Sequence, residues 1–194
     1  MRPLRVGIVA ESYFPSLGGI QEHVRHLRNL LDRQGVEVTV LTGTQPPSSA
    51  PGPADAERGV IRLGRARTFA SGGSFFQATV GLPAAYRFYR ALRARQFDLI
   101  NIHGPCDFGL PFWALAMYRG PKVLTLHNAA FADAPWRHRI APYYRWVFRR
   151  AAAVIAVSDT TSETMRRYAD FQSTIIPNGV DVSYWRAARR KTQR

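Results

Sequence analysis

Apolar runs alternate along this chain with segments in which apolar residues recur every three or four positions. Short apolar runs are typical of strands buried on both faces of a parallel sheet. They cover residues 4–10, 36–41, 60–63, 98–103, 122–126, 153–157 and 174–176. The periodic segments predict amphipathic helices at residues 21–33, 82–96, 110–118, 139–150 and 160–168. This alternation predicts an α/β fold with a single Rossmann-like, doubly wound parallel sheet.

Two internal segments do not follow the alternation. Residues 45–59 are rich in Pro, Ser and Ala and predict a surface loop, whereas residues 65–81 contain three glycines and favour no particular element. The remainder predicts one domain over residues 1–182, followed by a basic tail or interdomain linker over residues 183–194.

Length and cysteine content narrow the class of protein. The 194 residues, of which 46% are hydrophobic, are enough for one core. No apolar run approaches the roughly 20 residues of a membrane-spanning helix, and we expect no secretory signal. The lone Cys106 excludes an internal disulfide and indicates a reducing compartment, so we expect a cytoplasmic protein.

The net charge of the chain indicates what kind of partner it binds. The 27 Lys and Arg residues exceed the 13 Asp and Glu residues, for a formal net charge of +14. Such an excess indicates an anionic partner, which can be nucleic acid, acidic lipid or a phosphorylated substrate. In the predicted helix 82–96, Tyr89 belongs to the apolar face, and Arg87, Arg90 and Arg93 spread over the opposite face.

Polar and glycine residues gather where the predicted strands end. Ligands bind at the carboxyl ends of parallel strands. The candidate ligand-binding residues there are Glu11, Gly18, Gly19, His103, His127 and Asn128. The adjacent glycines permit close approach of a ligand to the backbone. The helix that follows them offers free N–H groups to an anion or a sugar hydroxyl.

Each of these residues also has a purely structural interpretation. His127 either contacts a ligand or caps the loop after its strand, and His103 either contacts a ligand or supports a tight turn. We expect His23 and His26 to be surface or packing residues. Ser158 is predicted to cap the helix that follows it.

Short catalytic motifs are absent from the sequence. It contains no H-E-x-x-H and only one cysteine, which argues against a metal site. It also contains no G-x-S-x-G and no P-loop, which argues against hydrolase and NTPase activity. The first strand is not followed by the G-x-G-x-x-G of an ordinary NAD site.

Four segments nevertheless occur in a characteristic order: YFPSLGGIQEHV, TLHNA, AVSD and IIPNGVD. Together they resemble the N-terminal, acceptor-binding half of retaining glycosyltransferases with the GT-B fold, family GT4. The sequence is most similar to the actinobacterial phosphatidylinositol mannosyltransferases. The resemblance covers residues 4–182.

The resemblance implies roles for the candidate residues. His127 would be the catalytic histidine that contacts the transferred sugar, and Gly18 and Gly19 would form the glycine loop near the acceptor and the donor phosphates. Around them, Glu11, His103 and Asn128 would complete the acceptor and phosphate contacts. The reaction implied needs no metal and no cofactor, because the nucleotide-sugar is a co-substrate.

The resemblance also implies partners. The donor-binding domain is expected to be absent, so we expect no sugar transfer by this chain without a partner that supplies that domain. A homodimer is a further alternative for the partner. Arg87, Arg90 and Arg93 would bind anionic lipid at the cytoplasmic face of the plasma membrane. The alternative is a non-enzymatic Rossmann-like module that binds anionic lipid or a partner chain. Nucleic acid is disfavoured because no nucleic-acid-binding motif is present.

Overall fold

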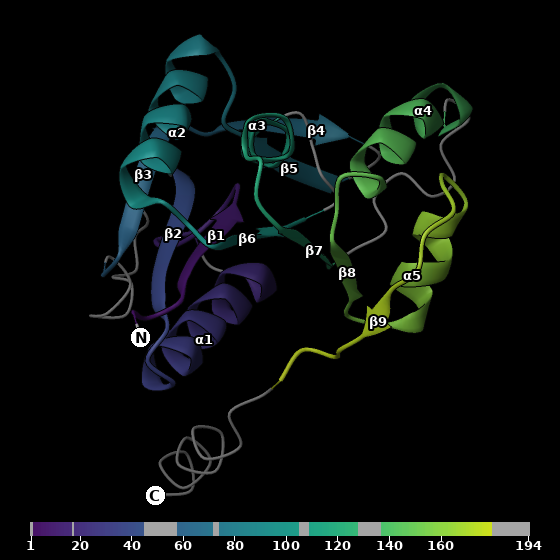
Figure 1. Cartoon of the computed structure of the whole chain (residues 1–194). Coiled ribbons are helices and arrows are strands. Elements are labelled where there is room, and N and C mark those ends of the chain that lie inside the picture. The colour runs from purple at the N-terminus through teal and green to yellow at the C-terminus, as the bar shows by residue number, and fades with distance from the viewer. Residues whose placement is uncertain are drawn as a thin grey trace, which may run out of the picture.

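The computed structural model describes residues 2–16, 18–44, 58–71, 74–104, 109–127 and 137–179. Its central feature is a seven-stranded parallel sheet with the strand order β3-β2-β1-β6-β7-β8-β9 (Figure 1). The strands are β1 (Arg5–Ala10), β2 (Glu37–Thr44), β3 (Val60–Arg65), β6 (Leu99–His103), β7 (Lys122–Leu126), β8 (Ala153–Ala156) and β9 (Thr174–Ile175). The predicted doubly wound α/β sheet is therefore confirmed.

Helices connect most of these strands. They are α1 (Gly19–Arg33), α2 (Leu82–Arg95), α3 (Leu110–Met117), α4 (Arg137–Phe148) and α5 (Asp159–Arg166). The segment that the sequence left unassigned forms β4 (Arg67–Ser71) and β5 (Ser74–Ala78), which pair antiparallel in a separate two-stranded sheet. Among the described residues, no helix combines the length and apolar character needed to cross a bilayer.

The core consists of two apolar clusters on opposite faces of the sheet. Alternate residues of a strand point to opposite faces. Accordingly, Ile8 of β1 and Val40 of β2 pack in one cluster with Val24 of α1. Their neighbours Val9 and Leu41 belong to the other cluster. That second cluster also contains residues of α2, α3, α4 and α5, so the sheet is covered on both faces.

Helix ends largely follow the local sequence. Gly35, directly after the last turn of α1, has a φ of +80°, a conformation that suits glycine at a helix C-terminus. Ser158 caps α5 as predicted, because its Oγ accepts a hydrogen bond from the backbone N–H of Thr161 at 3.2 Å. The spacing of Thr160 and Glu163 fits a capping box, but Ser158 and not Thr160 occupies the N-cap position.

The order of the strands places a topological switch at the centre of the sheet. From β1 the chain moves outward through β2 to β3, and then returns to pair β6 with the other side of β1. At such a point the flanking connections diverge to opposite faces and leave a crevice at the carboxyl ends of the strands. The ends of β1, β6 and β7 are therefore where a ligand site is expected.

Candidate functional site

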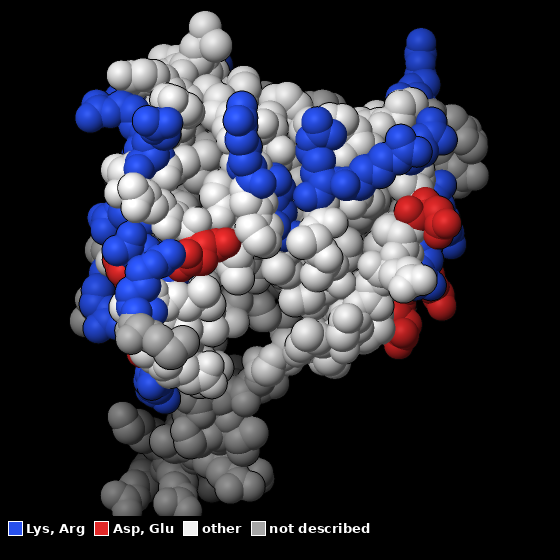
Figure 2. Space-filling view, viewed as in Figure 1, with Lys and Arg blue, Asp and Glu red and all other residues white. Residues whose placement is uncertain are grey.

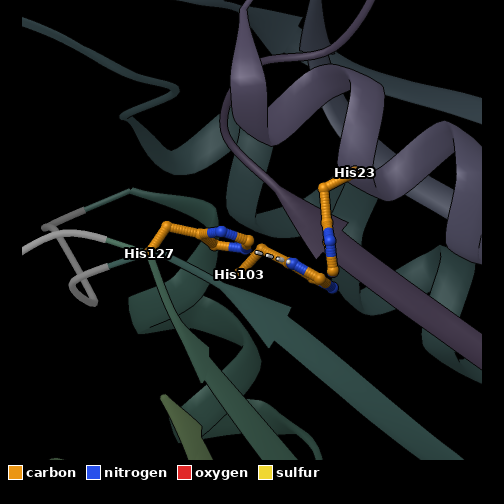
Figure 3. A group of neighbouring side chains, drawn as sticks. All are labelled: His23, His103 and His127. Carbon is orange, nitrogen blue, oxygen red and sulfur yellow. Dashed lines mark hydrogen bonds between the residues drawn. The ribbon is translucent and has the colours of Figure 1, made fainter. Parts of the chain in front are cut away.

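Three histidines lie together at this switch point, and we call His23, His103 and His127 the histidine cluster. One ring nitrogen from each lies within 4.8 Å of the others. Nδ1 of His103 is 2.9 Å from Nε2 of His127, a hydrogen bond between the two imidazoles. The centroid of the His23 ring lies 4.9 Å from that of His127 and 5.5 Å from that of His103. Figure 3 shows the three side chains gathered together, with the hydrogen bond between His103 and His127 as a dashed line.

Each member of the cluster is brought there by a different element. His103 is the last residue of β6 and is 2% exposed, and it pairs with Ala10 of β1 and Thr125 of β7 in the sheet. His127 directly follows β7 and is half-buried, while His23 lies in the first turns of α1. The sequence predicted His103 and His127 as site residues, and the structure brings them together.

His23 was missed. The sequence indicated a surface or packing residue, whereas the structure places its ring against two histidines of the sheet. The sequence did contain a signal. His23 lies one turn after Gly19, so the two residues share a face of α1 close to the glycine loop. His26, by contrast, pairs with Glu22 at 3.5 Å on the surface, as predicted.

Burial keeps the cluster uncharged at neutral pH. Loss of hydration lowers the pKa of His127 to about 4, with a smaller effect from neighbouring His23. Burial, followed by the nearby His127 and His23, holds the pKa of His103 well below its usual value. The pKa of His23 is also lowered, by burial and then by His26. All three imidazoles are therefore neutral and can exchange hydrogen bonds with hydroxyl groups.

The predicted glycine loop lies at the N-terminus of α1. Gly18 occupies the N-cap position and Gly19 is the first helical residue, and both are exposed. No described side chain caps this helix end, so its first N–H groups are open to an anionic or hydroxyl ligand. A Cβ on Gly18 would lie 2.6 Å from Oε1 of Gln21, whose Nε2 donates to Ser12 at 2.9 Å. A larger residue at the N-cap would therefore require the side chain of Gln21 to move.

Glu11 lies beside the cluster, directly after β1, but its carboxylate is engaged by the protein itself. One oxygen accepts the backbone N–H of Thr79 at 2.8 Å, and the other accepts the backbone N–H of Leu110. Glu11 thus joins the end of β1 to the start of α3 and to the segment after β5. Its direct contact with a ligand stays a prediction.

The arginine face of α2 is a second candidate region. Arg87, Arg90 and Arg93 are exposed, as predicted. Figure 2 shows Lys and Arg side chains across the upper part of the molecule and down its left side, with few Asp and Glu side chains on this face. The assignment of Tyr89 to the buried face is wrong, because its side chain is 48% exposed.

Other apolar side chains accompany Tyr89 on the surface of α2. Leu82 is 80% exposed and Tyr86 is 62% exposed, whereas the buried face of the helix is formed by Ala84, Ala85, Phe88 and Ala91. Small residues on the buried side let α2 pack closely on the sheet. The larger apolar and aromatic residues are left outside, among the arginines.

Three predicted features fall wholly or mostly outside the described residues. They are the surface loop at residues 45–59, of which only 58 and 59 are described, Asn128, and the basic tail of residues 183–194. Asn178 and Gly179 of the segment IIPNGVD are exposed and belong to no helix or strand.

The fold and the site together define a Rossmann-like domain with a small-ligand site at the switch point of its sheet. Neutral imidazoles and an open helix N-terminus suit a ligand with hydroxyl and phosphate groups. Comparison with known proteins identifies the family to which the domain belongs. The sequence profile described as Glycosyltransferase Family 4 matches residues 17–184. This chain belongs to glycosyltransferase family 4.

Curated relatives give the same result in more detail. The chain is 28% identical over 182 residues to phosphatidyl-myo-inositol mannosyltransferase of Mycobacterium leprae, covering 92% of this chain and 46% of that protein. It is 30% identical over 184 residues to the protein of the same name from Mycolicibacterium smegmatis, covering 93% of this chain and 45% of the relative. The chain therefore spans about half the length of the curated relatives it matches.

Solved structures agree on the fold. Sucrose-phosphate synthase from Thermosynechococcus elongatus superposes with a TM-score of 0.61 at 17% identity, covering 96% of this chain and 52% of that chain. The expected Rossmann-like half of a GT-B fold is confirmed. Similarity at this level of identity carries the fold and not the substrate.

Proposed function

We propose that this chain is the acceptor-binding half of a retaining mannosyltransferase that acts on an inositol lipid at the cytoplasmic membrane surface. The observation that carries the proposal is the match to family 4, combined with the position of His127 at the switch point of the sheet. The names of the relatives support the sugar and the acceptor class. The nucleotide-sugar would be the donor.

In this proposal His127 and the N-terminus of α1 contact different parts of the donor. The neutral ring of His127 contacts a hydroxyl group of the transferred sugar. The open N-terminus of α1 at Gly18 and Gly19 receives a phosphate, whose negative charge is stabilised by the helix dipole and free N–H groups. A second domain supplies the rest of the donor site, since the relatives are about twice as long as this chain.

Membrane docking is assigned to α2. Its exposed face combines Arg87, Arg90 and Arg93 with the apolar Leu82 and the aromatic Tyr86. Arginine binds anionic headgroups, and the apolar and aromatic side chains insert at the boundary between headgroups and acyl chains. This combination fits a peripheral membrane helix better than a helix that is merely solvated, because a solvated face has no need of large apolar residues.

The test is co-sedimentation of the purified chain with vesicles of phosphatidylcholine, with and without phosphatidylinositol, at low and high salt. Binding should require the anionic lipid and should fall as salt rises. Charge reversal of Arg87, Arg90 and Arg93 to glutamate should weaken binding at least about 100-fold, at about 1 kcal/mol for each basic residue removed.

A matched control keeps the same change of net charge. Arg33, Arg119 and Arg166 are exposed and lie outside α2, so their reversal to glutamate should leave most of the binding intact. Equal loss in both triple variants would refute docking through α2 and would leave only a general effect of the positive charge. Thermal unfolding of each variant checks that the fold is retained.

Catalysis is tested separately with a nucleotide-mannose and phosphatidylinositol. We expect no steady transfer by the chain alone, and transfer when a donor-binding half from a relative is added. Replacing His127 with alanine should then abolish most of the transfer, whereas His26→Ala should not. Steady transfer by the chain alone would contradict the need for a second domain.

A further inference from the structure

The histidine cluster has the composition of a metal site. Imidazole nitrogen is a good ligand for zinc, copper, nickel and cobalt ions, and such ions bind the neutral form of the ring. Catalytic zinc sites commonly hold the metal with three protein ligands and leave one position open. Here three imidazoles approach from α1, β6 and the end of β7, with one ring nitrogen of each within 4.8 Å of the others (Figure 3).

The spacing of the nitrogens is close to what a metal requires. Zinc–nitrogen bonds of about 2.0–2.1 Å in a tetrahedron place two ligand nitrogens about 3.3 Å apart. Nδ1 of His103 and Nε2 of His127 are 2.9 Å apart. A few tenths of an ångström of ring movement would open the pair, and the ring nitrogen of His23, which lies within 4.8 Å of the other two, would move closer to complete the third position.

A metal between the rings would change the protonation of the pair. In the hydrogen-bonded pair only one of the two facing nitrogens carries a proton. Nε2 of His103 and Nδ1 of His127 are buried and have no hydrogen-bond partner among the described residues. Binding of a metal by both facing nitrogens would require each ring to carry its proton on the outward nitrogen.

We propose that His23, His103 and His127 bind a divalent transition-metal ion of the zinc class, with an exchangeable ligand in the fourth position. His103 is buried, whereas His23 and His127 are only partly buried, and His23 lies one turn after the exposed Gly19 of the open helix N-terminus. The ion needs no residue outside the described part of the chain.

The proposal goes beyond the transferase function. No metal takes part in the transfer proposed above, so the ion would be an additional ligand of the same crevice. Because metal binding uses Nε2 of His127, a bound ion would exclude the sugar from that nitrogen. The two proposals are tested apart, since metal binding is measured with neither nucleotide-sugar nor acceptor present.

The experiment titrates the purified, chelator-treated chain with Co²⁺ and follows visible absorption, which is strong for four-coordinate cobalt and weak for the hydrated ion. Zn²⁺ is then added to displace the cobalt. We expect saturable binding of one ion for each chain, with absorption typical of four-coordination, that is lost on addition of zinc. Calorimetry with Zn²⁺ alone gives the affinity.

Variants identify the ligands. His23→Gln and His127→Gln should each weaken zinc binding at least about 100-fold, because removal of an outer-shell partner alone costs 10–100-fold. His26→Gln is the matched control, since His26 lies on the same helix but pairs with Glu22 on the surface. It should bind zinc as tightly as the natural sequence.

His23 is the most informative position because it is only half-buried, so its replacement should not prevent folding. Circular dichroism checks this for each variant. The proposal is overturned if the natural chain shows no four-coordinate cobalt spectrum. It is also overturned if His23→Gln and His26→Gln bind zinc equally well.

Discussion

The carboxylate of Glu11 joins three elements of the fold, which makes its replacement a sharp test of how the site is held. Its oxygens accept the backbone N–H groups of Thr79, at 2.8 Å, and of Leu110 at the start of α3. Replacement by glutamine keeps the volume of the side chain and one acceptor oxygen. The amide NH₂, however, would face a backbone N–H with no acceptor between them.

The expected cost follows from these contacts. Hydrogen bonds to a charged group contribute about 1.5–3 kcal/mol each, and a neutral one about 1 kcal/mol. Losing one charged bond and weakening the other therefore costs about 3–4 kcal/mol, including the charge lost from the N-terminus of α3. Domains of this size have total stabilities of about 5–15 kcal/mol, so Glu11→Gln should fold but unfold at much lower urea concentration.

The assay is urea unfolding at pH 7.5, followed by circular dichroism. Glu22→Gln is the control, because Glu22 lies on the surface and pairs with Arg25 at 3.2 Å. Surface ion pairs contribute about 0–1 kcal/mol, so this change should be nearly neutral. A loss below about 1 kcal/mol in Glu11→Gln, or a loss equal to that of Glu22→Gln, would refute the bracing role argued from the two amide contacts.

Three further outcomes are expected. Ser158→Ala should cost about 1 kcal/mol in urea unfolding, because it removes the cap from the N–H of Thr161; no change would show that the cap is dispensable. Gly109→Ala should lower the thermal midpoint, since a Cβ there would overlap the carboxylate of Glu11; an unchanged midpoint would contradict this. The pKa of His127, about 4, lies below its unfolded value. Acidification protonates the unfolded chain first, so stability should fall from pH 7.5 to 5.0, with about 2 kcal/mol of the loss due to His127 and a further loss due to His103 and His23, whose pKa values are also lowered. With a chelator present, His127→Gln should lose less, and equal losses would argue against the low pKa.

The pattern of apolar residues was sufficient to predict the main sheet and its helices. A strand buried on both faces must be apolar along its whole length, and a helix on the sheet needs only one apolar stripe, so the two patterns differ. The hairpin of β4 and β5 escaped prediction because it lies outside the main sheet, in a separate pair of antiparallel strands. Tyr89 was misplaced for a related reason: periodicity shows that a helix has an apolar side, but small alanines can occupy the buried side and leave larger residues exposed.

The candidate site divides in the same way. Parallel strands share one direction, so polar residues after each apolar run must reach the same edge of the sheet. The sequence by itself therefore determined that His103 and His127 lie at that edge. Only the tertiary structure decided that β6 lies between β1 and β7, and that α1 places His23 against the two histidines at the ends of β6 and β7. The distances between the three imidazole rings depend on how α1 packs against the sheet. That packing is set by side chains that are far apart along the chain.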